Sequence, residues 1–180
     1  MRKILRNRLA LSTVVTTLII LVVAVLLAGV VTYFAINVVS TSVQQESLSL
    51  SFAHLWVDTA GSSQAAILVT NTGGRDVVIS AVQIRGVAAT FGTNVYYDLV
   101  TTAPSDLSAN ATLAAGALTG TKGLTLASGG ILEIYISNPT GVSINDIGTT
   151  IGITVFTAQA MWTQETNVQS TTTTLPTTPT

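Results

Sequence analysis

The longest apolar stretch of the chain runs from Leu9 to Val39 and contains no Asp, Glu, Lys, Arg or His. About 20 apolar residues suffice to cross the hydrocarbon core of a bilayer as a helix, and this stretch is about ten residues longer. Its apolar residues fall on every side of a helix, and a helix that is apolar all round is buried all round. The pattern predicts a hydrophobic helix over residues 11–45. Lipid would cover two thirds of it, and the remainder would pack against protein.

Small and polar residues within this stretch suggest local interactions. Thr16, Thr17 and Thr32 are predicted to hydrogen-bond a carbonyl group one turn earlier, because no water is available to their hydroxyls in a membrane. Ala28 and Gly29 form a small-residue spot where a second helix could approach closely. An ordinary kink, or no role at all, explains this pair equally well.

The hydrophobic pattern changes after residue 47. The segment 40–47 is polar, and Leu48, Leu50 and Phe52 then alternate with small or polar residues, which predicts a half-buried strand. Further strands are expected at 65–70, 77–84, 130–136 and 149–158, the last of these closing the domain, with weaker candidates at 95–100 and 124–126. The turn sequence 71–74 between two apolar runs predicts a hairpin that joins the strands at 65–70 and 77–84.

These elements predict an α+β protein, in which a long N-terminal hydrophobic α-helix is followed by an antiparallel immunoglobulin-like β-sandwich head of roughly seven strands. The chain has no cysteine, so the sandwich would have no disulfide. We divide the sequence into a basic leader at 1–10, the hydrophobic helix at 11–45, the head at 46–169 and a Thr/Pro-rich tail at 170–180.

Charge is distributed unevenly along the chain. Four of its seven basic residues lie in the first eight positions, and the remainder carries three basic against eight acidic residues. Such an acidic surface argues against nucleic acid as a partner, since phosphate binding needs clustered Lys and Arg. Basic residues beside a first apolar helix stay in the cytoplasm, so the chain beyond Val39 is expected outside the cell.

The apolar run differs from an ordinary secretory signal. A conventional signal has 7 to 15 apolar residues followed by a small-residue cleavage site. Here the run is about twice as long, and no Ala-x-Ala pattern precedes Ser40. The hydrophobic helix is therefore expected to remain on the mature protein.

The segment Arg8–Leu21, which reads RLALSTVVTTLIIL, resembles the N-terminus of archaeal type IV pilins, the subunits of adhesive pili that carry a class III signal peptide. The resemblance covers residues 1 to about 45 and extends to the remainder only in architecture. It implies that a membrane prepilin peptidase cuts on the cytoplasmic side of the helix. The residues at the expected processing site are Arg8, Leu9, Ala10, Leu11 and Ser12.

The processing bond is left open within this window. Alignment on Ser12 places the small Ala10 before the cut, as the family prefers, but it places Leu9 where the family has Lys or Arg. Bacterial pilins and archaeal flagellins carry an acidic residue near the start of the helix, and its absence here favours an adhesive pilus over a rotating filament. The partners that the resemblance implies are further copies of the chain in a helical homopolymer, the prepilin peptidase with the pilus assembly machinery, and the membrane before assembly.

No pattern in the sequence indicates catalysis, a cofactor or a metal site. With one histidine, His54, and no cysteine, neither a His/Cys zinc site nor a Cys–His nucleophile pair can form. The Gly-rich segment 116–123 lacks the spacing of a phosphate-binding loop, and the carboxylates are scattered singly. We expect a protein that is not an enzyme.

Two features suggest modification on the outside of the cell. Asn110 begins the triplet Asn-Ala-Thr, which is an acceptor sequence for N-glycosylation. The tail at 170–180 is too poor in apolar residues to form a core, and it is expected to be exposed and extended, either as an O-glycan acceptor or simply as a frayed terminus.

The pattern bears on three functions from different classes. The first is a pilus subunit that moves its helix from the membrane into an apolar filament core without exposing it to water. The second is a monomeric, membrane-anchored extracellular β-sandwich that binds a ligand. The third, a surface hydrolase, has no residues to support it. The pilus subunit explains both the basic leader and the surplus length of the helix.

Overall fold

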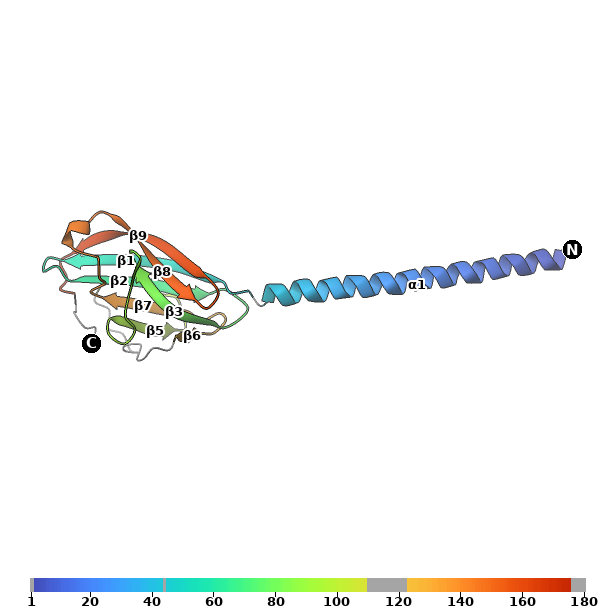
Figure 1. The fold of residues 1–180 in the computed structure, drawn as a ribbon, viewed down its shortest axis with the longest axis horizontal. Coiled ribbons are helices and arrows are strands. Elements are labelled where there is room, and N and C mark those ends of the chain that lie inside the picture. Colours follow the sequence, from blue (N-terminus) through green and yellow to red (C-terminus); the bar gives the residue numbers. More distant parts are fainter. Residues whose placement is uncertain (1, 44, 110–122, 176–180) are drawn as a thin grey trace. The chain divides into compact units, whose positions relative to one another are not determined.

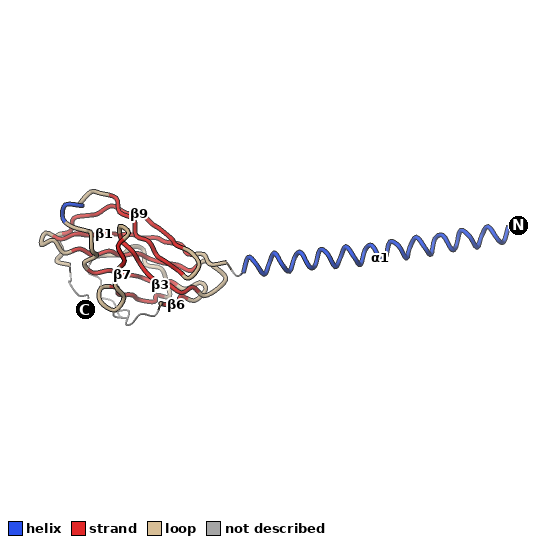
Figure 2. The backbone as a smooth tube through the Cα atoms, viewed as in Figure 1, coloured by secondary structure: helices blue, strands red, loops and turns tan. Residues whose placement is uncertain are grey.

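A computed structural model describes residues 2–43, 45–109 and 123–175, and within the helix it describes the side chains of residues 11–40. The chain divides into two compact units, Met1–Val43 and Gln44–Thr180. The first is the single α-helix α1, Arg2–Val43, shown in blue in Figure 1. The second is a head built from strands, in which the described part contains one short 3-10 turn, η1, at Ile144–Asp146 (Figure 2).

The N-terminal helix confirms the predicted apolar element. It begins earlier than the expected residue 11, and so includes the described part of the basic leader. Thr16 and Thr32 donate hydrogen bonds from Oγ1 to the carbonyl oxygens of Ser12 and Ala28, at 2.9 and 2.8 Å. Thr17 does the same to Val14 at 2.9 Å, so all three predicted bonds are present.

The described strands of the head join into one mostly antiparallel sheet. Their bounds are β1 Leu48–Asp58, β2 Ser63–Asn71, β3 Val77–Ile84, β4 Val87–Ala88, β5 Val95–Val100, β6 Leu124–Leu126, β7 Ile131–Ser137, β8 Thr150–Thr157 and β9 Met161–Thr171. Their order across the sheet is β4-β3-β8-β9-β1-β2-β7-β5, with β6 paired to β3. β1 and β9 run parallel, and the other named pairs are antiparallel. The predicted two-sheet immunoglobulin-like sandwich is not confirmed, because the parallel pair joins both halves into a single curled sheet (Figure 1).

The main core lies on the concave side of this curl. β7 contributes Leu132, Ile134 and Ile136, and β8 contributes Ile151, Ile153 and Val155, which confirms the faces predicted for both strands. The weaker strand candidates at 95–100 and 124–126 are also confirmed, as β5 and β6. Burial of these aliphatic side chains is the main favourable term that holds the head together.

Phe52 corrects the predicted face of β1. Residues 52 and 53 together oppose Ile67, because the pairing shifts between Ser51 and His54. Phe52 has a positive φ of 48° and is 37% exposed. This is a β-bulge, which adds one residue and reverses the alternation of faces. Core residues therefore fall at even positions before the bulge and at odd positions after it, as for Leu55.

The predicted hairpin between the second and third strands is wrong. β2 pairs with β1 and β7, whereas β3 pairs with β4, β6 and β8. Asn71 holds the turn that connects β2 to β3. Its Nδ2 donates to the carbonyl oxygens of Arg75, Leu126 and Ala127 at 2.8, 3.1 and 3.1 Å. These bonds tie the turn to the segment before β7, so β3 crosses to the other half of the sheet.

The prediction that the strand at 149–158 is the last one is also wrong. β9 follows β8 and lies between β8 and β1, although most of its residues are exposed and polar. The prediction of an exposed tail is wrong for Leu175, which is 3% exposed and packs against the head. Residues 176–180 lie outside the described part of the chain.

Candidate functional site: the apolar helix

The surface of α1 is the principal candidate for function. Every described side chain from Leu11 to Ser40 is exposed, and an 18-residue window within this span has a mean hydropathy of 3.1. Val, Leu and Ile side chains lie on all sides. Each buried methylene contributes about 0.8 kcal/mol when it leaves water, so a surface of this kind needs lipid or protein around it.

The length of this surface exceeds the thickness of a bilayer. At a rise of 1.5 Å per residue, the 30 residues of the span extend about 45 Å, whereas the hydrocarbon core is about 30 Å thick. The far end of the span still carries large apolar side chains, since Phe34, Ile36 and Val39 are 69%, 64% and 61% exposed, although Asn37 and Ser40 make it more polar than the middle. A membrane alone therefore does not cover an untilted helix of this length.

Ala28 and Gly29, the predicted packing spot, lie in the middle of the exposed span. A Cβ atom added at Gly29 would meet nothing within 4 Å, and the Ala28 carbonyl is occupied by Thr32. The helix is continuous here and its surface is open to a neighbour. Close packing at this spot stays a prediction.

The predicted processing residues belong to one uninterrupted stretch of α1. Arg8, Leu9 and Ala10 have helical backbone, and their side chains lie outside the described part of the chain. Leu11 and Ser12 are exposed, and the Ser12 carbonyl accepts the hydrogen bond of Thr16. The predicted glycosylation residue Asn110 lies outside the described residues.

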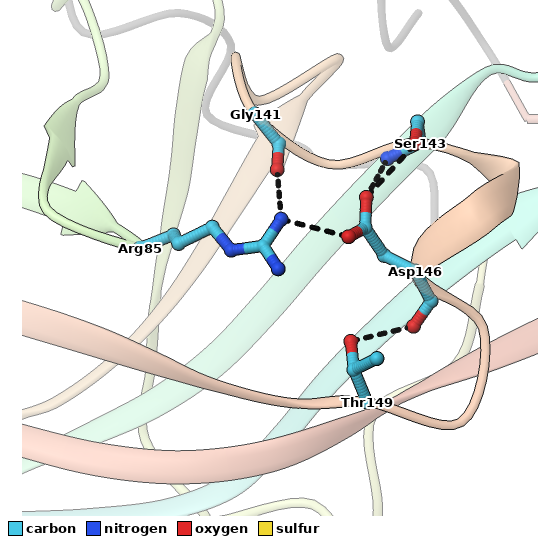
Figure 3. Close-up of polar contacts among 5 residues, drawn as sticks. All are labelled: Arg85, Gly141, Ser143, Asp146 and Thr149. Carbon is cyan, nitrogen blue, oxygen red and sulfur yellow. Dashed lines mark hydrogen bonds and ion pairs between the residues drawn. The ribbon is translucent and has the colours of Figure 1, made fainter.

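In the head, an arginine and an aspartate tie two loops together (Figure 3). Arg85 Nη1 donates to Asp146 Oδ1 at 2.7 Å and to the Gly141 carbonyl at 2.9 Å. Asp146 Oδ2 accepts the backbone N–H and the hydroxyl of Ser143, both at 2.8 Å. Arg85 and then Ser143 hold the pKa of Asp146 below its usual value. Because both carboxylate oxygens accept hydrogen bonds within the cluster, Asp146 anchors the two loops to each other.

A second polar pair involves the single histidine. His54 Nε2 and Asp106 Oδ1 are hydrogen-bonded at 2.7 Å, and the His54 ring stacks on Trp56 with centroids 5.0 Å apart. The hydrogen bond from His54, and then that from the Leu107 backbone, lowers the pKa of Asp106. The pair brings the segment before residue 110 onto β1. Within the described ranges, no three His, Asp or Glu side chains gather closely enough to hold a metal ion.

Sequence reasoning missed the anchoring roles of Asp58, Asp146 and Leu175. For Asp146 a local signal exists, because Ser143-x-x-Asp146 has the spacing of a capping box. Asp58 precedes a Gly-containing turn, which is typical of an aspartate that binds its own backbone. Leu175 is an isolated apolar residue in a Thr/Pro-rich segment, and nothing local says where it packs.

Comparisons with known proteins identify no family for this chain. No family model matches the sequence, and no curated protein matches it. Among solved structures, a family 123 glycoside hydrolase from Clostridium perfringens, studied for glycolipid glycan hydrolysis, aligns at 10% identity and a TM-score of 0.35. The alignment covers 73% of this chain and 28% of that one. A likeness of this extent carries no argument about function.

Proposed function

We propose that the protein is a structural, non-enzymatic subunit of an extracellular type IV-like pilus, which polymerises through its N-terminal helix and serves surface adhesion. The observation that carries the proposal is the exposed span Leu11–Ser40, which is apolar on all sides and about 15 Å longer than a bilayer core is thick. In a bundle of such helices, every side of each helix contacts another helix.

This arrangement explains how a water-insoluble surface reaches the outside of the cell. The helix first lies in the membrane, where its backbone hydrogen bonds are satisfied internally. Assembly then transfers it from lipid into the apolar bundle, so its side chains never meet water. A prepilin peptidase removes the leader within the window Arg8 to Leu11 before transfer, and Ala28 and Gly29 allow neighbouring helices to approach.

The strand order of the head supports an immunoglobulin-like architecture for the outer part of the filament. The path β1-β2-β7-β5 follows the order A-B-E-D of an immunoglobulin constant-type domain, and β3-β8-β9 follows the order C-F-G. The parallel pairing of β1 with β9 closes one side between the two halves. Heads of this kind would face outward, with Asn110 as a candidate glycosylation site.

A monomeric, membrane-anchored extracellular binding domain is the alternative. The observation that favours it is the same helix, since a span of this hydropathy is sufficient to insert in a membrane. It leaves about a third of the apolar length without lipid. It also gives the basic leader no role beyond orienting the helix.

Shearing of cells separates the two functions. The pilus proposal predicts that the protein is released by shear and sediments as filaments that dissociate only in strong detergent. The anchored monomer would stay with the membrane fraction, and detection of the protein only there would overturn the proposal. A strain that lacks the gene should lose the filaments and regain them on complementation.

A further inference from the structure

The head has a second apolar cluster that is separate from its main core. It lies on the other face of the strands β1, β2, β5 and β7, so β2 is buried on both faces. The cluster consists of Trp56, Ala66, Leu68, Tyr96, Leu107, Tyr135 and Leu175, and each of these side chains is at most 8% exposed. Five of the seven belong to strands, and we call these five the floor of the cluster: Trp56, Ala66, Leu68, Tyr96 and Tyr135.

Two segments outside the strands complete this cluster. Leu107 belongs to the loop that follows β5, and it is held by Asp106, which accepts the Leu107 N–H at 2.8 Å and the bond from His54. Leu175 belongs to the segment that follows β9. We call residues 172–175 the C-terminal strap.

The strap starts beside its own anchor. The parallel pairing of β1 and β9 ends with Asp58 opposite Thr171, so the chain leaves the sheet next to the Asp58 carboxylate. Asp58 Oδ1 is occupied by the N–H groups of Ala60 and Ser62, at 2.9 and 2.8 Å. Asp58 Oδ2 accepts the N–H of Leu175 at 3.1 Å. The turn after β1 thus fixes a carboxylate that receives the strap.

We propose that the head has a binding site for an extended peptide. The C-terminal strap of this chain occupies the site and can be displaced from it. The floor takes one leucine-sized side chain, that of Leu175, and the Asp58 carboxylate accepts the backbone N–H of the same residue. The ligand class is therefore an extended chain with a branched aliphatic side chain. The site lies within the head, so the inference does not depend on whether the helix polymerises.

The contacts of the strap are few compared with those of a strand. Beyond Thr171, the described strap residues make no ladder with the sheet, and their hydrogen bonds are those of Leu175 to Asp58 and of the Thr173 N–H to Thr171 Oγ1 at 3.1 Å. Segments with few buried contacts open at a small fraction of the global unfolding free energy. The floor, in contrast, belongs to paired strands that also line the main core, so it persists when the strap leaves.

A peptide added in trans tests this site. The receptor is the protein in detergent micelles, with its helix retained and its chain truncated after Thr171 so that the strap is missing. The matched control is truncated after Leu175. The probe is a fluorescent peptide with the sequence of residues 171–180, measured by fluorescence anisotropy, and empty micelles serve as the blank. We expect saturable binding to the chain that ends at Thr171 and none to the chain that ends at Leu175, whose site is filled in cis.

Two changes define the specificity of the site. A probe with Leu175→Asp should bind at least about tenfold more weakly, because a charge would enter an apolar floor. The receptor change Asp58→Asn should weaken binding of the unchanged probe roughly tenfold, because a hydrogen bond to a charged acceptor is lost. Equal binding of both probes would overturn the proposal.

The result also depends on whether the chain that ends at Thr171 keeps its fold. If the chain that ends at Thr171 keeps the circular dichroism spectrum of the control and does not bind the probe, there is no separable site. If the truncation unfolds the head, the segment is an integral part of the fold and the proposal fails. As a second variant, the full-length chain with Leu175→Ala keeps the strap but empties the floor, and it should bind the probe where the unchanged full-length chain does not.

Discussion

Three aspartates, Asp58, Asp106 and Asp146, each fix a loop of the head. Burial by itself raises the pKa of Asp58, but the backbone N–H groups of Leu175, Ser62, Ala60 and Gly61 outweigh it, so the pKa is lowered overall. The pKa values of Asp106 and Asp146 are lowered by His54 and by Arg85. Each carboxylate therefore stabilises the folded head in its ionised form.

The lowered pKa values predict a loss of stability in acid. A carboxyl group with a depressed pKa contributes stability above its unfolded pKa of about 3.9, and the contribution disappears as the pH falls through the folded value. The melting temperature should thus decrease below about pH 4. The Asp146→Asn variant should be less stable near neutral pH and should lose less on acidification, as measured by thermal melts between pH 2 and 7.

Comparison of the two melting curves isolates Asp146 from groups of opposite sign. Burial, and then the charge of Asp98, raises the pKa of Glu133, and that group favours the folded head in acid. Its effect is common to both proteins and cancels in the difference between them. Parallel curves for the two proteins would contradict the role of the Asp146 carboxylate.

Gly73 marks a place where the chain that enters the head leaves no room for a side chain. A Cβ atom at this position would lie 2.8 Å from the Gln45 carbonyl oxygen and 2.8 Å from the Ser47 nitrogen. Both are backbone atoms, and Ser47 is held by hydrogen bonds from the N–H groups of Thr72 and Gly73, at 2.9 and 3.0 Å.

We expect Gly73→Ala to destabilise the head by about 1 to 3 kcal/mol, the usual cost of forced overpacking. Denaturant unfolding of the full chain in micelles, followed by strand circular dichroism, measures this effect. The matched control is Gly152→Ala, whose Cβ would make an ordinary contact of 3.4 Å with Thr163 Cγ2. Equal midpoints for both variants would show that the entering segment can shift away.

At the scale of elements, hydrophobic periodicity predicted those parts of the fold in which one face is continuously buried. The strands β7 and β8 follow this rule, whereas the helix was predicted from its uninterrupted apolar run. Periodicity failed where tertiary contacts decide. A bulge at Phe52 reverses the faces of β1. The hydrogen bonds of Asn71 hold the turn after β2 against the segment before β7, and not in a hairpin with β3. β9 has no hydrophobic pattern, because most of its residues are polar and exposed.

The proposed function predicts that the basic leader is removed from the mature protein. We expect the mature protein to begin within the window Arg8 to Leu11, because the peptidase cuts where the basic segment meets the apolar helix. Mass spectrometry of the N-terminal peptide from sheared material measures the new terminus directly. A protein that still begins at Met1, or one that begins near Ser40, would not fit a pilin.

The two units of the molecule differ in whether their apolar residues are buried. The head buries its own apolar residues in two clusters, whereas the helix leaves residues 11–40 exposed along its whole length. The apolar composition made the helix predictable. The packing of Leu175 on Asp58 was not predictable, because the two residues are 117 positions apart and no local pattern encodes a contact between them.

The pilus proposal requires the outer third of the helix to become buried in an assembly, and cysteine labelling measures this burial. The chain has no native cysteine, so Ile36→Cys introduces a unique thiol, and Gln169→Cys provides a control at an exposed position of β9. Reaction with a membrane-impermeant maleimide is compared between intact sheared filaments and the same material after dissociation. We predict that Cys at position 36 reacts only after dissociation, whereas the head control reacts in both states. Equal reaction of both thiols in the intact material would contradict a buried role for the outer helix, and with it the pilus proposal.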